Sequence, residues 1–263
     1  MLKNLVLNLD SRIQFNHHPN LSNSFRMLIV GSSGCGKTTL LFQMLLEPGF
    51  LDYDNLIIFT STPKQQEYQL LYQGFKNKLT KENIASIAVN QAEIRRDYKD
   101  ASIEDICRLI QQANKSKGEI TVTLSNKLDE IPYPDKLQKD KKHLIIFDDC
   151  VTQKNQDVMG SYWARSRHAG CNCIYLSQSF FELDRLIRLN SNFLILFKLS
   201  QRNRNDIYNQ VVGTIMDKAK FAALADNVWS KKHRYIVIDK DRNRIYDDIF
   251  TEYEDSSDED NDL

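Results

Sequence analysis

The sequence predicts an α/β fold with a mostly parallel central sheet, helices on both faces and a C-terminal β-hairpin. Three observations lead to this prediction. Apolar runs rich in Ile, Val, Leu and Phe alternate with segments of helical character, as in chains that build parallel sheets. Several of these runs are continuously apolar, which is typical of strands buried on both faces. The turn-forming stretch "DKDRNR" separates the last two runs, which indicates a hairpin and an antiparallel edge.

The individual elements follow from the same alternation. The expected strands are 26–31, 56–60, 85–89, 144–149, 173–177, 193–198, 234–239 and 244–250. The expected helices are 36–46, 65–78, 102–116, 154–168, 182–189, 203–212 and 215–226. The segment 127–143 is charged and carries two prolines, so we expect a surface loop there.

The composition is that of a folded protein in a reducing compartment. The 263 residues suffice for one large or two small domains, and 41% of them are hydrophobic. The sequence contains no apolar run of about 18 residues and no signal-peptide pattern, so we expect neither a transmembrane helix nor a membrane partner. The odd number of cysteines, five, is typical of free thiols inside the cell. Cys171 and Cys173 are expected to face opposite sides of a sheet.

The formal net charge of zero conceals an uneven distribution. The last twelve residues, "EYEDSSDEDNDL", hold seven acids and no Lys or Arg, which leaves a charge of +7 on residues 1–251. Such a composition is typical of a disordered terminus. Alternatively, the acidic strip competes with an anionic ligand for a basic surface. The basic stretches 185–190, 198–205 and 230–234 are either solvated faces or a surface that follows a phosphate backbone without reading bases.

The stretch "LIVGSSGCGKTTLL" (28–41) contains a phosphate-binding pattern. Its residues 31–38, "GSSGCGKT", match G-x-x-x-x-G-K-[ST], and they lie between an apolar strand and a helix-forming run, as the pattern requires. The glycines allow backbone N–H groups to turn toward phosphates, and the helix N-terminus adds its positive dipole end. Lys37 is expected to reach the β- and γ-phosphates, and the Thr38 hydroxyl to ligate Mg²⁺.

A second apolar run, "HLIIFDDC", carries Asp148 and Asp149 to the carboxyl end of a buried strand, where open α/β sheets bind ligands. Beside a phosphate loop, Asp148 is expected to bind Mg²⁺ and Asp149 to act as general base toward the attacking water. Two acids in this position can also serve solubility alone. The expected strands 56–60 and 85–89 lie between the loop and the acidic run, and an extra strand there is the order of RecA-like ATPases.

Further candidate residues surround the strand that follows. Gln178 ends this strand, where its amide either senses the γ-phosphate and orients water or bonds a neighbouring loop. Arg165 and Arg167 close the preceding helix. They are either a cationic helix end matched to the dipole, or one of them is an arginine finger that reaches the nucleotide of a neighbouring subunit. Such a finger adds about 10³–10⁵ in rate and makes hydrolysis depend on assembly.

Three stretches together carry a resemblance to a known family: "VGSSGCGKTTLL", "LIIFDDC" and "RSRHAGCNCIYLSQSFFELDRLIRLNSNFLILFKL". They resemble the genome-packaging ATPases of the FtsK–HerA superfamily, most closely the poxvirus-type branch of large DNA viruses, virophages and Polinton-like elements. The resemblance runs from about residue 24 to 212. The third stretch is the most diagnostic, and the residues beyond 212 match nothing assignable.

The resemblance implies a RecA-like P-loop NTPase fold of the ASCE type and an ATPase that uses ATP and Mg²⁺. Asp148 and Thr38 would hold Mg²⁺, Asp149 would be the base in a place where wider relatives often have Glu, and Gln178 would be the sensor. Either Arg165 or Arg167 would be the finger that acts in trans. The residues expected to bind ATP are Gly31, Ser32, Ser33, Gly34, Cys35, Gly36, Lys37, Thr38 and Thr39.

The family also implies partners and a location. Its members form rings that drive double-stranded DNA into a preformed capsid. We therefore expect non-specific duplex DNA, further copies of the chain in a ring of five or six, and capsid proteins as partners, in the host cytoplasm or viral factory or with the virion. The expected organisation is an N-terminal extension (1–23), an ATPase domain (24–251) and an acidic disordered tail (252–263).

Two other functions remain open on the same residues. The first is a DNA helicase or a conjugation-type DNA pump, although the chain is short and helicase motifs are missing. The second is an assembly factor that binds a nucleotide without hydrolysing it.

Overall fold

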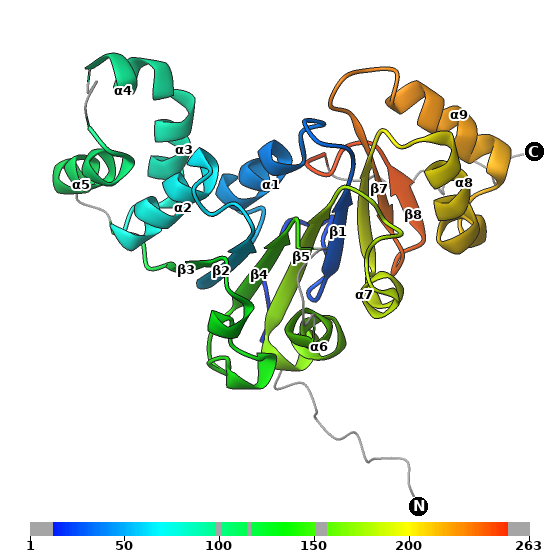
Figure 1. Cartoon of the computed structure of the whole chain (residues 1–263), viewed down its shortest axis with the longest axis horizontal. Coiled ribbons are helices and arrows are strands. Elements are labelled where there is room, and N and C mark those ends of the chain that lie inside the picture. The colour runs from blue at the N-terminus through cyan, green and yellow to red at the C-terminus, as the bar shows by residue number, and fades with distance from the viewer. Residues whose placement is uncertain (1–12, 98–100, 115–116, 151–156, 252–263) are drawn as a thin grey trace, which may run out of the picture.

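The computed structural model describes residues 13–97, 101–114, 117–150 and 157–251. Within these residues one eight-stranded sheet runs through the molecule in the order β3-β2-β4-β5-β1-β6-β7-β8 (Figure 1). The first six strands in this order are parallel to one another. Strand β7 is antiparallel to β6, and β8 is antiparallel to β7. The strands are β1 (Arg26–Val30), β2 (Asn55–Thr60), β3 (Thr121–Ser125), β4 (His143–Asp148), β5 (Cys171–Ser177), β6 (Phe193–Phe197), β7 (Tyr235–Asp239) and β8 (Arg244–Tyr246). The predicted fold class and C-terminal hairpin are confirmed.

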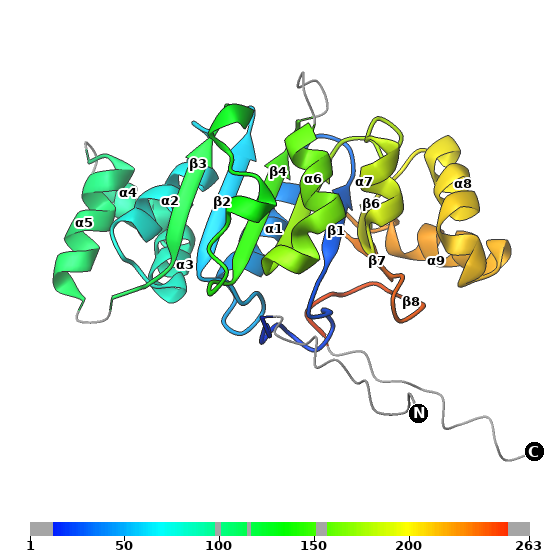
Figure 2. The same cartoon turned by 90° about the horizontal axis from the view of Figure 1, so that it is seen from below.

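Helices cover both faces of the sheet (Figure 2). On one face lie α1 (Lys37–Leu46), α2 (Gln66–Lys76), α3 (Lys81–Val89) and α5 (Ile103–Ala113), with α4 (Gln91–Asp97) following α3. On the other face lie α6 (Asp157–Arg165), α7 (Arg185–Asn190), α8 (Gln201–Gln210) and α9 (Lys218–Val228). Short 3₁₀ turns occur at Leu128–Glu130, Pro134–Lys136, Ser166–Ala169 and Val212–Thr214. Within the described part of the chain, every helix is too short or too polar to traverse a lipid bilayer.

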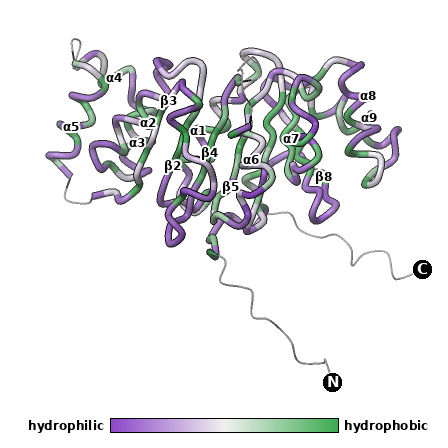
Figure 3. The backbone as a smooth tube through the Cα atoms, turned by 60° about the horizontal axis from the view of Figure 1, so that its bottom comes forward, coloured by the Kyte–Doolittle hydropathy of each residue, from purple (hydrophilic) through white to green (hydrophobic). Residues whose placement is uncertain are grey.

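Two apolar clusters, one on each face, hold the helices to the sheet. Strand β1 shows the alternation: Met27 and Ile29 pack with α1, whereas Leu28 and Val30 pack on the face of α6. Burying these side chains on both faces contributes about 25 cal/mol per Å² of apolar surface, which explains why the strands read as unbroken apolar runs. Figure 3 shows hydrophobic residues concentrated along the strands and hydrophilic ones in the connecting loops.

The expected strand 85–89 is wrong, because these residues end helix α3. The Oγ1 atom of Thr80 accepts a hydrogen bond from the backbone N–H of Asn83 and caps the helix. Ile84 and Ile87 are buried three positions apart, whereas Val89 is 83% exposed. This is a helical period rather than the period of two of a strand.

A strand that the sequence did not indicate, β3, takes its place in the sheet. Among the described strands it pairs with β2 alone and lies at the edge of the sheet, and most of its residues are half-buried. Its alternation of threonines with Val and Leu lacks the continuous apolar character of the central strands. The expectation for the cysteines is also wrong: Cys171 and Cys173 pack in the same cluster, because residues two apart on a strand share a face.

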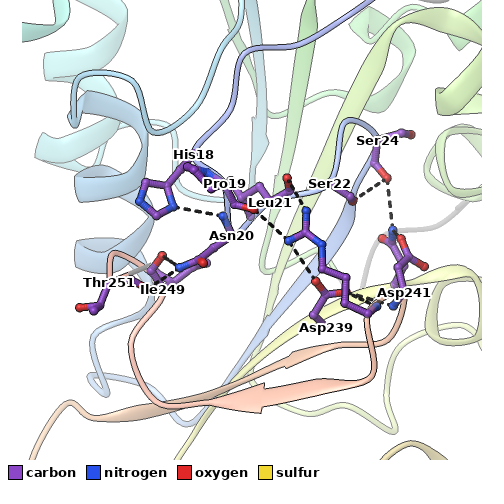
Figure 4. Close-up of polar contacts among 12 residues, drawn as sticks. His18, Pro19, Asn20, Leu21, Ser22, Ser24, Asp239, Asp241, Ile249 and Thr251 are labelled. Carbon is purple, nitrogen blue, oxygen red and sulfur yellow. Dashed lines mark hydrogen bonds and ion pairs between the residues drawn. The ribbon is translucent and has the colours of Figure 1, made fainter. Parts of the chain in front are cut away.

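The segment around Asn20 is joined to the C-terminal end of the described residues (Figure 4). The Nδ2 atom of Asn20 donates to the carbonyl oxygens of Ile249 and Thr251 at 2.9 and 2.6 Å. From the β7–β8 hairpin, Arg242 donates to the carbonyl oxygen of Pro19 at 3.0 Å. The segment around Asn20 is thereby tied to the hairpin. The predicted acidic tail and residues 1–12 of the predicted extension lie outside the described residues.

Candidate active site

The predicted phosphate loop joins β1 to α1 at the carboxyl edge of the sheet. Gly36 caps α1 with a left-handed φ of 112°, and Gly34 has a φ of 72°, both of which favour glycine. No side chain caps α1, and its first turn holds no acidic residue. The N–H groups of the first turn are therefore open to an anion, which the helix dipole also favours.

Gly31 is required by the close approach of β6. A Cβ atom at this position would lie 2.6 Å from Cβ of Phe197 and 2.7 Å from Sγ of Cys35, far inside van der Waals contact. The N–H of Gly31 also donates to the carbonyl of Ser177 at the end of β5, at 3.1 Å. The loop is thus fixed between the ends of β5 and β6.

Lys37 lies across the loop that it follows. Its Nζ donates to the carbonyl oxygens of Gly31 and Ser32 at 2.6 and 3.0 Å. Beside it, Thr38 is half-buried and Thr39 is exposed. The outer part of the loop, Ser32, Ser33 and Gly34, is exposed. The lysine therefore sits over the backbone turn where the sequence pattern places phosphates.

Asp148 ends β4 as a buried carboxylate. Burial raises its pKa, as does the nearby Asp149, whereas a hydrogen bond from Tyr68 and the charge of Lys37 oppose this. The Tyr68 hydroxyl donates to Oδ2 of Asp148 at 2.6 Å. Carboxylate and hydroxyl oxygens are the hard ligands that Mg²⁺ prefers, and in nucleotide sites Mg²⁺ uses one or two of them together with phosphate and water. Asp148 and Thr38 suit such an ion.

Asp149 leaves the strand in a left-handed conformation with φ of 51° and is exposed. Both of its carboxylate oxygens face the Nε2 atom of Gln178 at 3.4 Å, a long hydrogen-bond distance. The strand β5, which carries Gln178, lies between β1 and β4. The structure therefore places an acid and an amide side by side, with Gln178 between the strand end that carries the phosphate loop and the strand end that carries Asp148.

Arg165 and Arg167 lie at the opposite edge of the sheet. Arg165 ends α6 and Arg167 lies in the 3₁₀ turn that follows. Both precede β5, whose seven residues span about 20 Å to the edge that carries Gln178. Both side chains are exposed and line a pocket of about 660 Å³ together with His168. The structure does not bring them to the phosphate loop of their own chain.

Tyr68 is a site residue that sequence reasoning missed. It is almost fully buried on α2, and in the sequence it reads as one more apolar position of an amphipathic helix. Burial and Asp148 both raise the pKa of its hydroxyl, so the hydroxyl stays protonated and donates a hydrogen bond to the carboxylate throughout the physiological pH range. Helix α2 thereby orients the carboxylate proposed to hold the metal.

Replacing Tyr68 by phenylalanine is expected to raise the Mg²⁺ concentration needed for half-maximal ATP hydrolysis by about tenfold. Phenylalanine retains the volume but not the hydroxyl that orients Asp148, and loss of such a supporting bond typically weakens metal affinity 10–100-fold. The measurement is a Mg²⁺ titration of the hydrolysis rate, together with the rise in melting temperature that MgADP produces.

Tyr53→Phe is the matched control. Tyr53 is buried in the same cluster, and its hydroxyl donates to the carbonyl of Leu45 at 2.9 Å. The variant therefore also loses one buried hydrogen bond, but this bond does not involve Asp148. If the Mg²⁺ requirement changes equally in both variants, or does not change in Tyr68→Phe, then Tyr68 does not orient Asp148 for metal binding.

The chain is similar to several solved structures. A structure of the genome packaging NTPase B204 from Sulfolobus turreted icosahedral virus 2 in complex with AMP is 14% identical, covers 86% of this chain and 98% of its own, and has a TM-score of 0.50. The same protein with ATP-gammaS is 15% identical over 86% and 97% of the two chains, with a TM-score of 0.48. VirB4 of Thermoanaerobacter pseudethanolicus is 11% identical over 84% and 88%, with a TM-score of 0.46. At 14% identity the likeness to the complex with AMP concerns the fold alone.

A comparison with curated protein sequences found no match. The family model described as "Poxvirus A32 protein" matches residues 12–261. This match includes the phosphate loop, the acidic strand end and Gln178, and it also takes in the residues beyond 212 that the sequence left unassigned. The predicted resemblance to the poxvirus-type branch is confirmed, and the chain belongs to the poxvirus A32 protein family.

Proposed function

We propose that this chain is an ATP-hydrolysing motor that translocates double-stranded DNA into a viral capsid and acts as a homo-oligomeric ring. The observation that carries the proposal is the meeting of the phosphate loop with Asp148, Asp149 and Gln178 at one edge of the sheet. Membership of the poxvirus A32 family and the B204 packaging NTPase as a structural neighbour support an ATPase of viral genome packaging.

The chemistry that we assign to each residue follows from its place. The loop amides, with Lys37, would hold the phosphates of ATP, and Asp148 and Thr38 would hold Mg²⁺, which neutralises charge on the β- and γ-phosphates. Asp149 would accept the proton of the attacking water, and Gln178, within bonding distance of that carboxylate, would orient the water. Because Asp is one methylene shorter than Glu, the water would lie closer to the carboxylate or be reached less directly.

The ring is supported by the position of the arginines. Arg165 and Arg167 are exposed and lie a strand length from their own phosphate loop, so a finger role requires a second subunit. The DNA partner is supported by exposed basic residues, Arg185, Lys198 and Arg202, on segments that follow β5 and β6. Capsid proteins would be the fixed partners against which the ring pushes.

The cysteines bear on where the protein works. All five lie within the described residues as free thiols, and four of them are buried. This supports a reducing compartment, such as the host cytoplasm or viral factory, as the place of folding. Association with the virion would follow during packaging.

Duplex DNA is expected to stimulate ATP hydrolysis, and the stimulation to fall steeply between about 50 and 200 mM salt. Contacts with a phosphate backbone release counterions, so the logarithm of the binding constant falls linearly with log[salt]. The measurement is the hydrolysis rate with and without blunt duplex over a salt series, and the DNA-free rate at each salt is the control. Stimulation that does not respond to salt would argue against a motor that follows the backbone.

A helicase or conjugation-type pump remains the alternative function on this fold. A strand-displacement assay on a labelled duplex, run beside the hydrolysis assay, separates the helicase, because a packaging motor is stimulated by blunt duplex without releasing a strand. Strand displacement coupled to hydrolysis would favour the helicase.

A further inference from the structure

The 230–234 loop, which connects α9 to β7, reaches the phosphate loop from the C-terminal part of the chain. The Nδ1–H of His233 donates to the carbonyl oxygen of Cys35 at 2.9 Å. The same ring packs against the next residue, since a Cβ atom at Gly36 would lie 3.4 Å from His233 Nδ1. Figure 1 shows this loop arching toward the start of α1.

His233 bonds to the peptide unit between Cys35 and Gly36, whose N–H group belongs to the predicted phosphate-binding loop. In a planar trans peptide the C=O of Cys35 and the N–H of Gly36 point in opposite directions. A donor that holds the Cys35 oxygen on the outer side of the loop therefore turns the Gly36 N–H inward. Inward N–H groups are what make such a loop an anion site.

His233 is held there in a conformation that non-glycine residues seldom adopt, with φ of 63°. Its neighbours support it. Arg234 forms an ion pair with Asp247 at 2.6 Å, and the ring of Tyr235 packs on Phe197 with centroids 5.5 Å apart. A left-handed residue maintained by its surroundings and bonded to a phosphate loop is typical of a functional position.

The sheet order indicates which part of the nucleotide this loop would meet. Asp149 and Gln178 lie at the ends of β4 and β5, on one side of β1, whereas the 230–234 loop begins β7 on the other side. The reacting γ-phosphate belongs on the side of the acid and the amide. The rest of the nucleotide then extends toward β6 and β7, where Lys231 and Lys232 are exposed.

We propose that His233 is a positioning residue for ATP, which orients the Gly36 amide through Cys35, and that the 230–234 loop forms the wall of the nucleotide site on the side of the ribose and base. This inference rests on the proposed nucleotide site. It gives the C-terminal hairpin a part in ATP binding rather than in bond cleavage.

His233→Ala is expected to raise the Kd for ATP-gammaS and the KM for ATP by about tenfold, the cost of one lost hydrogen bond, while kcat at saturating ATP stays nearly unchanged. His233→Asn is expected to restore affinity to near the wild-type value, because the Asn Nδ2 can replace the ring Nδ1–H and Asn tolerates the left-handed region. Calorimetric titration with ATP-gammaS and steady-state kinetics measure both.

Asn243→Ala is the matched control, since Asn243 is an exposed left-handed residue with φ of 53° at the other end of β7. Its Kd is expected to equal that of the wild type. Equal binding by His233→Ala and wild type overturns this inference alone. An equal loss in His233→Ala, His233→Asn and Asn243→Ala also overturns it, because hairpin stability then explains the effect. A wild-type chain that binds no ATP overturns the nucleotide site and this inference together.

Discussion

Replacing Asp149 by asparagine is expected to lower kcat for ATP hydrolysis by at least about a hundredfold, while ATP still binds with near wild-type affinity. The carboxylate is the proposed proton acceptor, and general-base catalysis contributes about 10²–10⁴ in rate. Asparagine tolerates the left-handed φ of 51° and can still bond Gln178, so the geometry of the strand end is retained. Hydrolysis kinetics and ATP-gammaS titration check the two halves of this expectation.

Lys37→Ala provides the comparison, because it removes the cation that lies over the phosphate loop and is expected to abolish binding as well as turnover. The pair also separates a motor from an assembly factor. If particles assemble and DNA is still packaged with Asp149→Asn but not with Lys37→Ala, the nucleotide acts by binding alone. Packaging that stops in both variants supports the motor.

The double substitution of Arg165 and Arg167 by alanine is expected to lower DNA-stimulated hydrolysis by about 10³-fold, which is within the range of a missing arginine finger. The two arginines lie at the edge of the sheet opposite the phosphate loop, so the loss would occur in trans. Mixing this variant with Lys37→Ala subunits is therefore expected to restore part of the rate. An intact phosphate loop that lies next to a Lys37→Ala subunit then meets a neighbour that has its arginines.

The control mixes Lys37→Ala with Asp149→Asn. Both lesions lie in the phosphate-loop half of the site, so every subunit lacks a working pocket and no rescue is expected. Hydrolysis measured across a series of mixing ratios distinguishes the two mixtures. If the arginine variant is not rescued at any ratio, the finger assignment is wrong, and the two side chains belong to the cationic end of α6.

Much of the architecture could be predicted because its signals are local. The unbroken apolar runs reflect burial on both faces of a sheet, and six of the predicted strands carry this pattern. The hairpin was predicted from its turn sequence. The spacing of the glycines, the lysine and the threonine in residues 31–38 is sufficient to predict a phosphate loop. The prediction of a strand at 85–89 was wrong because a short apolar run is too short to show whether its period is that of a helix or of a strand. The burial of Ile84 and Ile87 in the tertiary structure shows that the segment is helical.

What tertiary structure decided is which distant side chains meet. Tyr68 reaches Asp148 across 80 positions, and His233 reaches Cys35 across 198. Neither contact has a sequence signature, because each depends on which strands are neighbours in the sheet and which edge a loop returns to. The sequence alone determined the fold class, the phosphate loop and the acidic strand end, since periodicity and spacing are properties of neighbouring residues. The order of the strands in the sheet determined which side chains orient the phosphate loop and the acidic strand end. It also determined that Arg165 and Arg167 lie at the opposite edge of the sheet.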